Sequence, residues 1–135
     1  MIVAAHQHRM LRFPHRETFR AVRRVAAGEK RKDASVSIVF TDDRFMKNMN
    51  KRYLRHNRIT DVISFPLESA SGIEGEVYVN LDQARRQARD YGVAFHAEVK
   101  RLVVHGTLHL MGYRDSTPSL KARMSRREDY YLASL

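Results

Sequence analysis

Two β-branched runs determine the architecture of this chain: TDVISFP at residues 60–66 and GEVYVN at residues 75–80. Both are rich in Val, Ile, Phe and Tyr, which fit a half-buried pleated surface. Pro66 stops the first run, because proline lacks the backbone donor that a central strand needs. A turn containing Gly, Ser and Glu at residues 68–75 connects the runs. They therefore predict two successive β-strands.

The segments on either side carry further helix and strand patterns. On the C-terminal side, helices are predicted at about residues 82–91, 94–111 and 117–132. On the N-terminal side, a short strand-like start precedes a helix over Arg16–Lys30, a strand over Ser35–Phe40 and a helix from the capping residue Asp42 to about Tyr53. The pattern predicts an α+β fold in a single domain over residues 1–135, with a small mixed β-sheet of about four strands covered by about five helices.

Composition narrows the class of protein. The fractions of hydrophobic (43%) and charged (30%) residues are those of a soluble globular domain, and no apolar run reaches the roughly 20 residues of a membrane-spanning helix. Cysteine is absent, which excludes disulfides and thiolate metal sites and fits a cytoplasmic location. The net charge of +10 favours RNA or DNA as the partner over a membrane surface, because clustered cations concentrate polyanions.

The strongest chemical signal is HGTLHLMGYRD at residues 105–115. His105 and His109 are four residues apart, so a helix places both imidazoles on one face. Gly112 is a typical helix terminator, after which Asp115 can supply a third ligand. Three ligands with an open fourth position are typical of a catalytic metal site, where the metal acidifies water and polarises a phosphoryl oxygen.

Two alternatives bear on this reading. The sequence lacks a glutamate directly after His105, which argues against the zinc peptidases of the His-Glu-x-x-His type. The histidine pair is also compatible with two partly buried, hydrogen-bonded side chains that hold no metal.

The run HGTLHLMGYRD resembles the signature of the YbeY family, HGxLHLxGYDH. The resemblance extends to TDVISFP, to GEVYV at residues 75–79 and to Met124 with Glu128, and it covers about residues 36–132. It implies a metal-dependent single-strand endoribonuclease that matures the 3′ end of small-subunit rRNA and takes part in ribosome quality control. It also implies one bound divalent ion, with Zn²⁺ as the leading candidate, and the ribosomal subunit as a partner. No oligomeric state follows from it.

The signature departs from the family at two positions. Asp115 stands where the family has its third histidine, and Arg114 stands where it has aspartate. A carboxylate is a competent third ligand and is harder than imidazole, so Mn²⁺, Ni²⁺ or Fe²⁺ can replace Zn²⁺. Arg114 is then free to face a phosphate. The alternative is that the third ligand is lost and the protein binds RNA without cutting it.

A third departure from the family lies just before the predicted strand TDVISFP. The family has a functionally important Tyr-Arg pair there, whereas this chain has Tyr53-Leu54 followed by Arg55. Arg55 or Arg52 can supply the missing cation from a neighbouring position, and with Arg58 they are candidate phosphate contacts. The alternative is that they are ordinary solvated arginines.

Two residues of the predicted strand TDVISFP are candidate catalytic groups, because the family places this strand beside the metal helix. Asp61 and Ser64 can orient water or a phosphate. Alternatively, Asp61 caps a turn and Ser64 bonds to the backbone, as such residues commonly do.

The leading hypothesis is therefore an endoribonuclease with His105, His109 and Asp115 as metal ligands. A ribose 2′-hydroxyl and a water molecule are both compatible as its nucleophile. The competing hypotheses are a non-catalytic ribosome- or RNA-binding accessory protein and a metal-dependent hydrolase of a small substrate. The last leaves the positive charge unexplained.

Overall fold

The computed structural model describes residues 1–54, 59–69 and 72–135. Its elements are β1 (Ile2–His6), α1 (His15–Gly28), β2 (Ser35–Thr41), α2 (Asp43–Met49), the π-helical turn η1 (Asn50–Leu54), β3 (Val62–Leu67), β4 (Glu74–Asn80), α3 (Leu81–Tyr91), α4 (Phe95–Leu110) and α5 (Pro118–Leu132). The described residues thus form four strands and five α-helices, and the predicted α+β class in one domain is confirmed.

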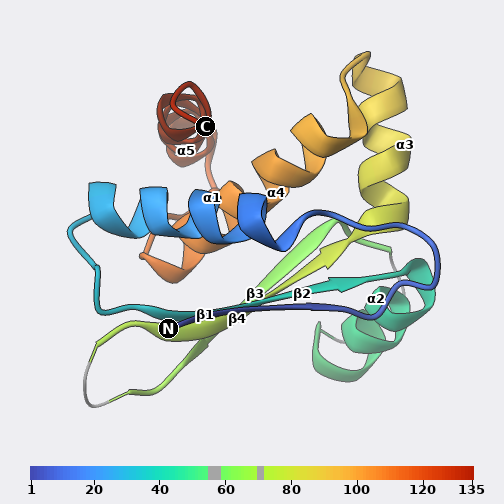
Figure 1. The fold of residues 1–135 in the computed structure, drawn as a ribbon, viewed down its shortest axis with the longest axis horizontal. Coiled ribbons are helices and arrows are strands. Elements are labelled where there is room, and N and C mark those ends of the chain that lie inside the picture. The colour runs from blue at the N-terminus through green and yellow to red at the C-terminus, as the bar shows by residue number, and fades with distance from the viewer. Residues whose placement is uncertain (55–58, 70–71) are drawn as a thin grey trace.

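The strands form one mixed sheet in the order β1-β2-β4-β3 (Figure 1). β1, β2 and β4 run parallel to one another, whereas β3 lies antiparallel to β4 at the edge. The register pairs Ser64 of β3 with Val77 of β4. Because side chains alternate along a strand and match across a pair, these two residues share one face of the sheet. That face is the one against which α4 packs.

Most of the helical material lies on one side of the sheet (Figure 1). α1 and α4 pack against each other on that side, and α5 packs on both of them as a further layer. The helix α2 lies on the other side, where the ring of Phe45 stacks on Tyr78 with centroids 5.6 Å apart. The buried core between sheet and helices is aliphatic and aromatic, with Val22, Val25, Ile38, Phe40, Val77, Val79, Val103, Leu108, Met124 and Tyr131.

The structure differs from the sequence expectation in the helix predicted from Asp42 to Tyr53. The cap is as predicted, because the Asp42 carboxylate accepts a hydrogen bond from the Phe45 amide at 2.9 Å. The α-helix ends at Met49, however, and the chain continues as the π turn η1. Asn50 is buried, four residues after the buried Met46, but the wider turn leaves Tyr53 exposed. A regular 3.6-residue period does not predict that exposure.

The helix predicted over Arg16–Lys30 also ends early, at Gly28. Lys30 adopts a φ of +60°, the left-handed region that a helix interior excludes.

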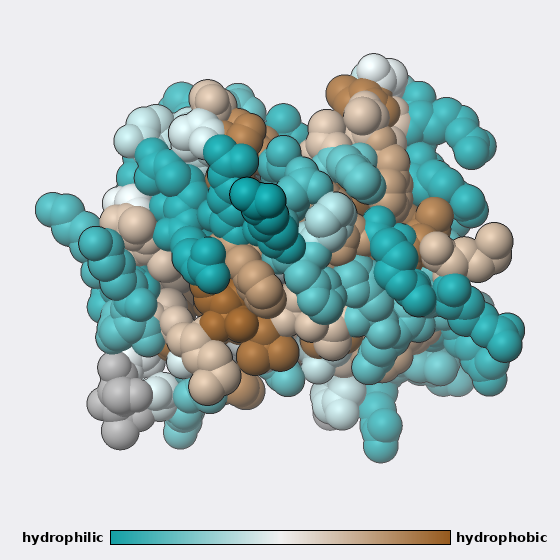
Figure 2. Space-filling view, viewed as in Figure 1, coloured by the Kyte–Doolittle hydropathy of each residue, from teal (hydrophilic) through white to brown (hydrophobic). Residues whose placement is uncertain are grey.

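The face of the molecule seen in Figure 2 is mostly hydrophilic, with an apolar patch below α1. Here Met1, Ile2, Phe19 and Val22 contribute to the lining of a hollow of about 520 Å³. In the described part of the chain, no helix combines the length and apolar character that membrane crossing requires.

Candidate metal centre

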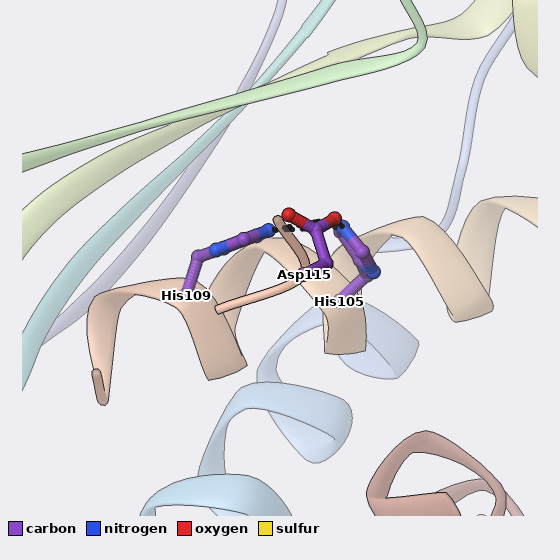
Figure 3. A group of neighbouring side chains, drawn as sticks. All are labelled: His105, His109 and Asp115. Atoms are coloured by element: carbon purple, nitrogen blue, oxygen red, sulfur yellow. Dashed lines mark hydrogen bonds and ion pairs between the residues drawn. The ribbon is translucent and has the colours of Figure 1, made fainter. Parts of the chain in front are cut away.

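The candidate centre is built on the C-terminal half of α4. The four-residue spacing of His105 and His109 places both imidazoles on the side of the helix that faces β3. Gly112 follows the helix with a φ of +103°, which lets the chain reverse, and the Tyr113 amide donates to the Leu108 carbonyl at 3.1 Å. The reversal returns Asp115 to the two histidines, as the glycine stop predicted (Figure 3).

Three donor atoms from these residues converge (Figure 3). Nε2 of His105 lies 3.1 Å from Nε2 of His109. The Asp115 Oδ2 atom lies 3.5 Å from the first nitrogen and 3.4 Å from the second. The three atoms form a nearly equilateral triangle, and their residues line a cleft.

This triangle fits a first-row divalent ion. Ligand atoms bound tetrahedrally at about 2.0–2.1 Å lie about 3.3 Å apart, close to the three distances found. Two imidazole nitrogens and one carboxylate oxygen are also a donor set that zinc, manganese, nickel and iron accept. The residues present therefore fit one divalent ion.

A buried carboxylate fixes the orientation of His105. Its Nδ1 atom lies 2.6 Å from Oε2 of Glu128, a residue of α5 that is 7% exposed. The other oxygen of Glu128 accepts a hydrogen bond from Arg101 Nη1 at 3.2 Å. An imidazole that donates through Nδ1–H presents an unprotonated Nε2, which is the form that binds a metal.

The same contact alters the acidity of His105 in the metal-free protein. Burial lowers the pKa of this imidazole, but the hydrogen bond and charge of Glu128, with the charges of Asp115 and Asp61, raise it more. The net result is a raised pKa, because the anionic surroundings stabilise the imidazolium.

The glycine between the two histidines brings α4 close to the sheet. A Cβ atom at Gly106 would lie 2.4 Å from Cγ1 of Val77, which is far inside van der Waals contact. The close approach also lets the Ser64 hydroxyl donate to the Gly106 carbonyl at 2.9 Å. Ser64 therefore ties β3 to the metal helix through the backbone, which was the alternative expected for it.

A cleft of about 400 Å³ lies over the three donors. Its lining includes Asp61 and Ser64 from the β3 side and Arg114 from the loop after α4. The half-buried Asp61 carboxylate accepts no hydrogen bond from another described residue and lines the cleft. Arg114 is exposed at the rim.

Of the three arginines predicted before β3, Arg52 lies within the described residues. Arg52 is exposed on η1, with its guanidinium 5.8 Å from the ring centroid of Tyr53, and it is absent from the described lining. Arg55 and Arg58 lie outside the described residues.

Sequence reasoning missed two carboxylates that support the centre. Glu128 was noted only as part of a Met-x-x-x-Glu pattern, although its four-residue spacing from the core residue Met124 was a signal that it faces inward. Glu29 follows α1, and its Oε1 atom accepts a hydrogen bond from the Tyr113 hydroxyl at 2.9 Å. That contact anchors the loop that carries Asp115, and no local pattern indicates it.

The chain is similar to several known proteins. A solution structure of a Thermotoga maritima protein superposes with a TM-score of 0.69 over 98% of this chain and 87% of that one, at 23% identity, which supports the fold alone. Endoribonuclease YbeY of Chloroherpeton thalassium is 38% identical over 90% of this chain and 86% of its own length. The corresponding protein of Chlorobium phaeovibrioides is 34% identical over 100% and 91%. The family described as Endoribonuclease YbeY matches residues 3–135, and the chain belongs to that family.

Proposed function

We propose that this chain is a metal-dependent endoribonuclease that cuts single-stranded RNA during maturation of the 3′ end of small-subunit rRNA. The observation that carries the proposal is the triangle of donor atoms in a cleft that also holds Asp61 and Arg114. Membership of an endoribonuclease family and the net charge of +10 support RNA as the substrate. The ribosomal subunit as partner, the cytoplasm as location and a part in ribosome quality control belong to the same proposal.

Each residue of the cleft has a role in this proposal. His105, His109 and Asp115 hold one divalent ion, which supplies Lewis acidity toward a phosphoryl oxygen and toward water. Zn²⁺ is the first candidate, and Asp115 admits Mn²⁺, Ni²⁺ or Fe²⁺. Asp61 accepts the proton of the attacking group, a ribose hydroxyl or water, because its carboxylate lines the cleft without a competing partner among the described residues.

The arginines complete the substrate site. Arg114 binds the RNA backbone at the rim of the cleft, since a guanidinium matches the oxygens of a phosphate. Arg55 is proposed as the cation that replaces the family's missing arginine, with Arg52 and Arg58 as further phosphate contacts. Ser64 acts by holding α4 against β3.

Elemental analysis of untagged protein tests the proposal, with wild type compared to His109→Ala, Asp115→Ala and the control Asp129→Ala. Asp129 is exposed on α5, and among the described residues its carboxylate pairs only with Arg101, at 3.5 Å. We expect near-stoichiometric metal in wild type and in the control, and loss in the other two. Folded wild type without metal after reconstitution contradicts the proposal, and metal that survives Asp115→Ala removes Asp115 from the ligand set.

Cleavage of single-stranded RNA by the reconstituted protein tests the chemistry. We expect Asp61→Asn to lower kcat by about 100-fold while the metal content stays at the wild-type level. A product with a 2′,3′-cyclic phosphate identifies the ribose hydroxyl as nucleophile, and a 5′-phosphate with a free 3′-hydroxyl identifies water. Equal kcat values for Asp61→Asn and wild type contradict the role of Asp61.

A further inference from the structure

A second hollow adjoins the metal cleft. It has a volume of about 270 Å³ and lies between the loop after α4, the start of α5 and the end of α1. Arg114 lines both this hollow and the metal cleft, so the two are neighbours along the surface. Arg123 of α5 and Tyr113 of the loop also line the second hollow.

The three arginines clustered on α5, Arg123, Arg126 and Arg127, have different surroundings. The Arg127 guanidinium is engaged within the protein, because it donates hydrogen bonds to Glu29 Oε2 at 2.9 Å and to the Tyr131 hydroxyl at 3.1 Å. Arg126 is exposed and is not part of the described lining of the hollow. Arg123 alone of the three lines the hollow, with its guanidinium 5.5 Å from the ring centroid of Tyr113.

Two cations in the hollow lack an anionic partner. In the structure of residues 1–54, 59–69 and 72–135, neither Arg114 nor Arg123 forms a salt bridge or donates a hydrogen bond. Clefts that gather unpaired guanidinium groups of one sign attract phosphates, and arginine can bind a phosphate through two parallel hydrogen bonds.

The carboxylate of Glu29, which also lines the hollow, does not cancel this charge. Glu29 accepts hydrogen bonds from the hydroxyls of Tyr113 and Tyr131 and from Arg127. Its charge is therefore balanced by Arg127, and the positive charges of Arg114 and Arg123 remain in excess within the hollow.

We propose that the hollow between Arg114 and Arg123 is a second phosphate subsite for single-stranded RNA. It binds the phosphodiester group next to the one in the metal cleft, and Arg114 lies between the two groups. The inference rests on the proposed function, which supplies the strand that spans both hollows.

The salt dependence of RNA binding tests the subsite without relying on cleavage. Metal-free wild type, Arg123→Gln and the matched control Arg126→Gln are titrated with a fluorescent single-stranded RNA at several salt concentrations. We expect Arg123→Gln to raise the Kd by about fivefold and to reduce the slope of log Kd against log salt by about 0.7, the value for one phosphate contact on a single strand. Arg126→Gln should keep the wild-type slope.

Cleavage kinetics give a second readout with the metal-loaded protein. A dinucleotide has one phosphodiester group, which occupies only the metal cleft. We therefore expect Arg123→Gln to raise the KM for a longer RNA by about fivefold, with kcat and the kcat/KM for the dinucleotide unchanged.

The outcomes separate the two proposals. Wild type that binds and cuts RNA, with equal salt slopes for Arg123→Gln and Arg126→Gln, overturns the subsite and leaves the nuclease. Wild type that neither binds nor cuts RNA with any candidate metal overturns both. An equal loss of kcat/KM for the dinucleotide and the longer RNA also overturns the subsite, because it places Arg123 at the cut phosphate.

Discussion

Nδ1 of His105 lies 2.6 Å from Oε2 of Glu128, and this contact joins the metal helix α4 to α5. The carboxylate is buried and shared with Arg101, so its position is fixed from two sides. A hydrogen-bonded carboxylate behind a metal-binding imidazole sets its tautomer and increases its basicity.

Replacement of Glu128 by Gln should therefore weaken metal binding. The amide keeps the shape and removes the charge, and we expect the Kd for Zn²⁺ to rise by about 10-fold or more. Competition with a chromogenic chelator measures the change. The control Asp129→Asn alters an exposed neighbour on the same helix and should leave the Kd within about twofold. Equal affinities for the two variants would show that Glu128 only packs α5 against α4.

Glu29 should make stability depend on pH in the acidic range. Burial raises the pKa of Glu29, but hydrogen bonds from Tyr131, Tyr113 and Arg127 lower it more, and the pKa lies below its usual value of 4.5. A lowered pKa in the folded state stabilises the fold above the unfolded value, and this contribution is lost as the pH falls from about 4.5 through the folded pKa.

Glu29→Gln removes that titration. We expect the variant to be less stable than wild type at neutral pH, with the difference in Tm shrinking as the pH falls below about 4.5. Thermal unfolding followed by circular dichroism measures it. Glu68→Gln, at an exposed carboxylate, is the control and should follow wild type. A Tm difference for Glu29→Gln that stays constant with pH argues against this linkage.

Gly106→Ala should separate α4 from the sheet. The new methyl group would meet Cγ1 of Val77, and we expect a loss of about 1–3 kcal/mol of unfolding free energy, measured by urea denaturation. Val77→Ala removes the opposing atom, so the double variant should be more stable than the sum of the single effects by about 1 kcal/mol. Strict additivity would mean that the helix does not press on Val77.

Asp115→His should change which metal the centre prefers. The substitution exchanges a hard anionic oxygen for an imidazole nitrogen, which suits zinc better than manganese. We expect the ratio of the Kd for Mn²⁺ to the Kd for Zn²⁺ to rise by about 10-fold, and chelator competition with each metal measures it. Asp115→Asn keeps an oxygen donor but loses the charge, and should weaken both metals. A ratio unchanged in Asp115→His would remove Asp115 from the ligand set.

The elements nearest the site could be predicted well from local pattern. The histidine helix was expected at about residues 94–111 and is found at Phe95–Leu110. The features that predict this helix are its apolar positions, the histidine spacing and the glycine that ends it. All of them lie close together in the sequence. The approach of Asp115 follows from the same short segment, so the donor triangle could also be foreseen.

Contacts between distant segments could not be predicted in this way. Glu29 and Tyr113 are 84 residues apart, and their meeting depends on how α1 and the loop after α4 pack on one core. The π turn at Asn50–Leu54 leaves Tyr53 exposed, although Tyr53 lies seven residues after the buried Met46, where a regular helix would bury it. The roles of Arg52, Arg55, Arg58 and Asp61 remain predictions.

The place of Glu128 in the chain has a consequence during translation. His105 and His109 are synthesised before the carboxylate that orients His105, because α4 precedes α5 in the chain. A nascent chain with a finished α4 therefore still lacks the buried acceptor for one imidazole. For an enzyme proposed to cut ribosomal RNA, the order of synthesis keeps the centre incomplete while the ribosome is still making that part of the chain.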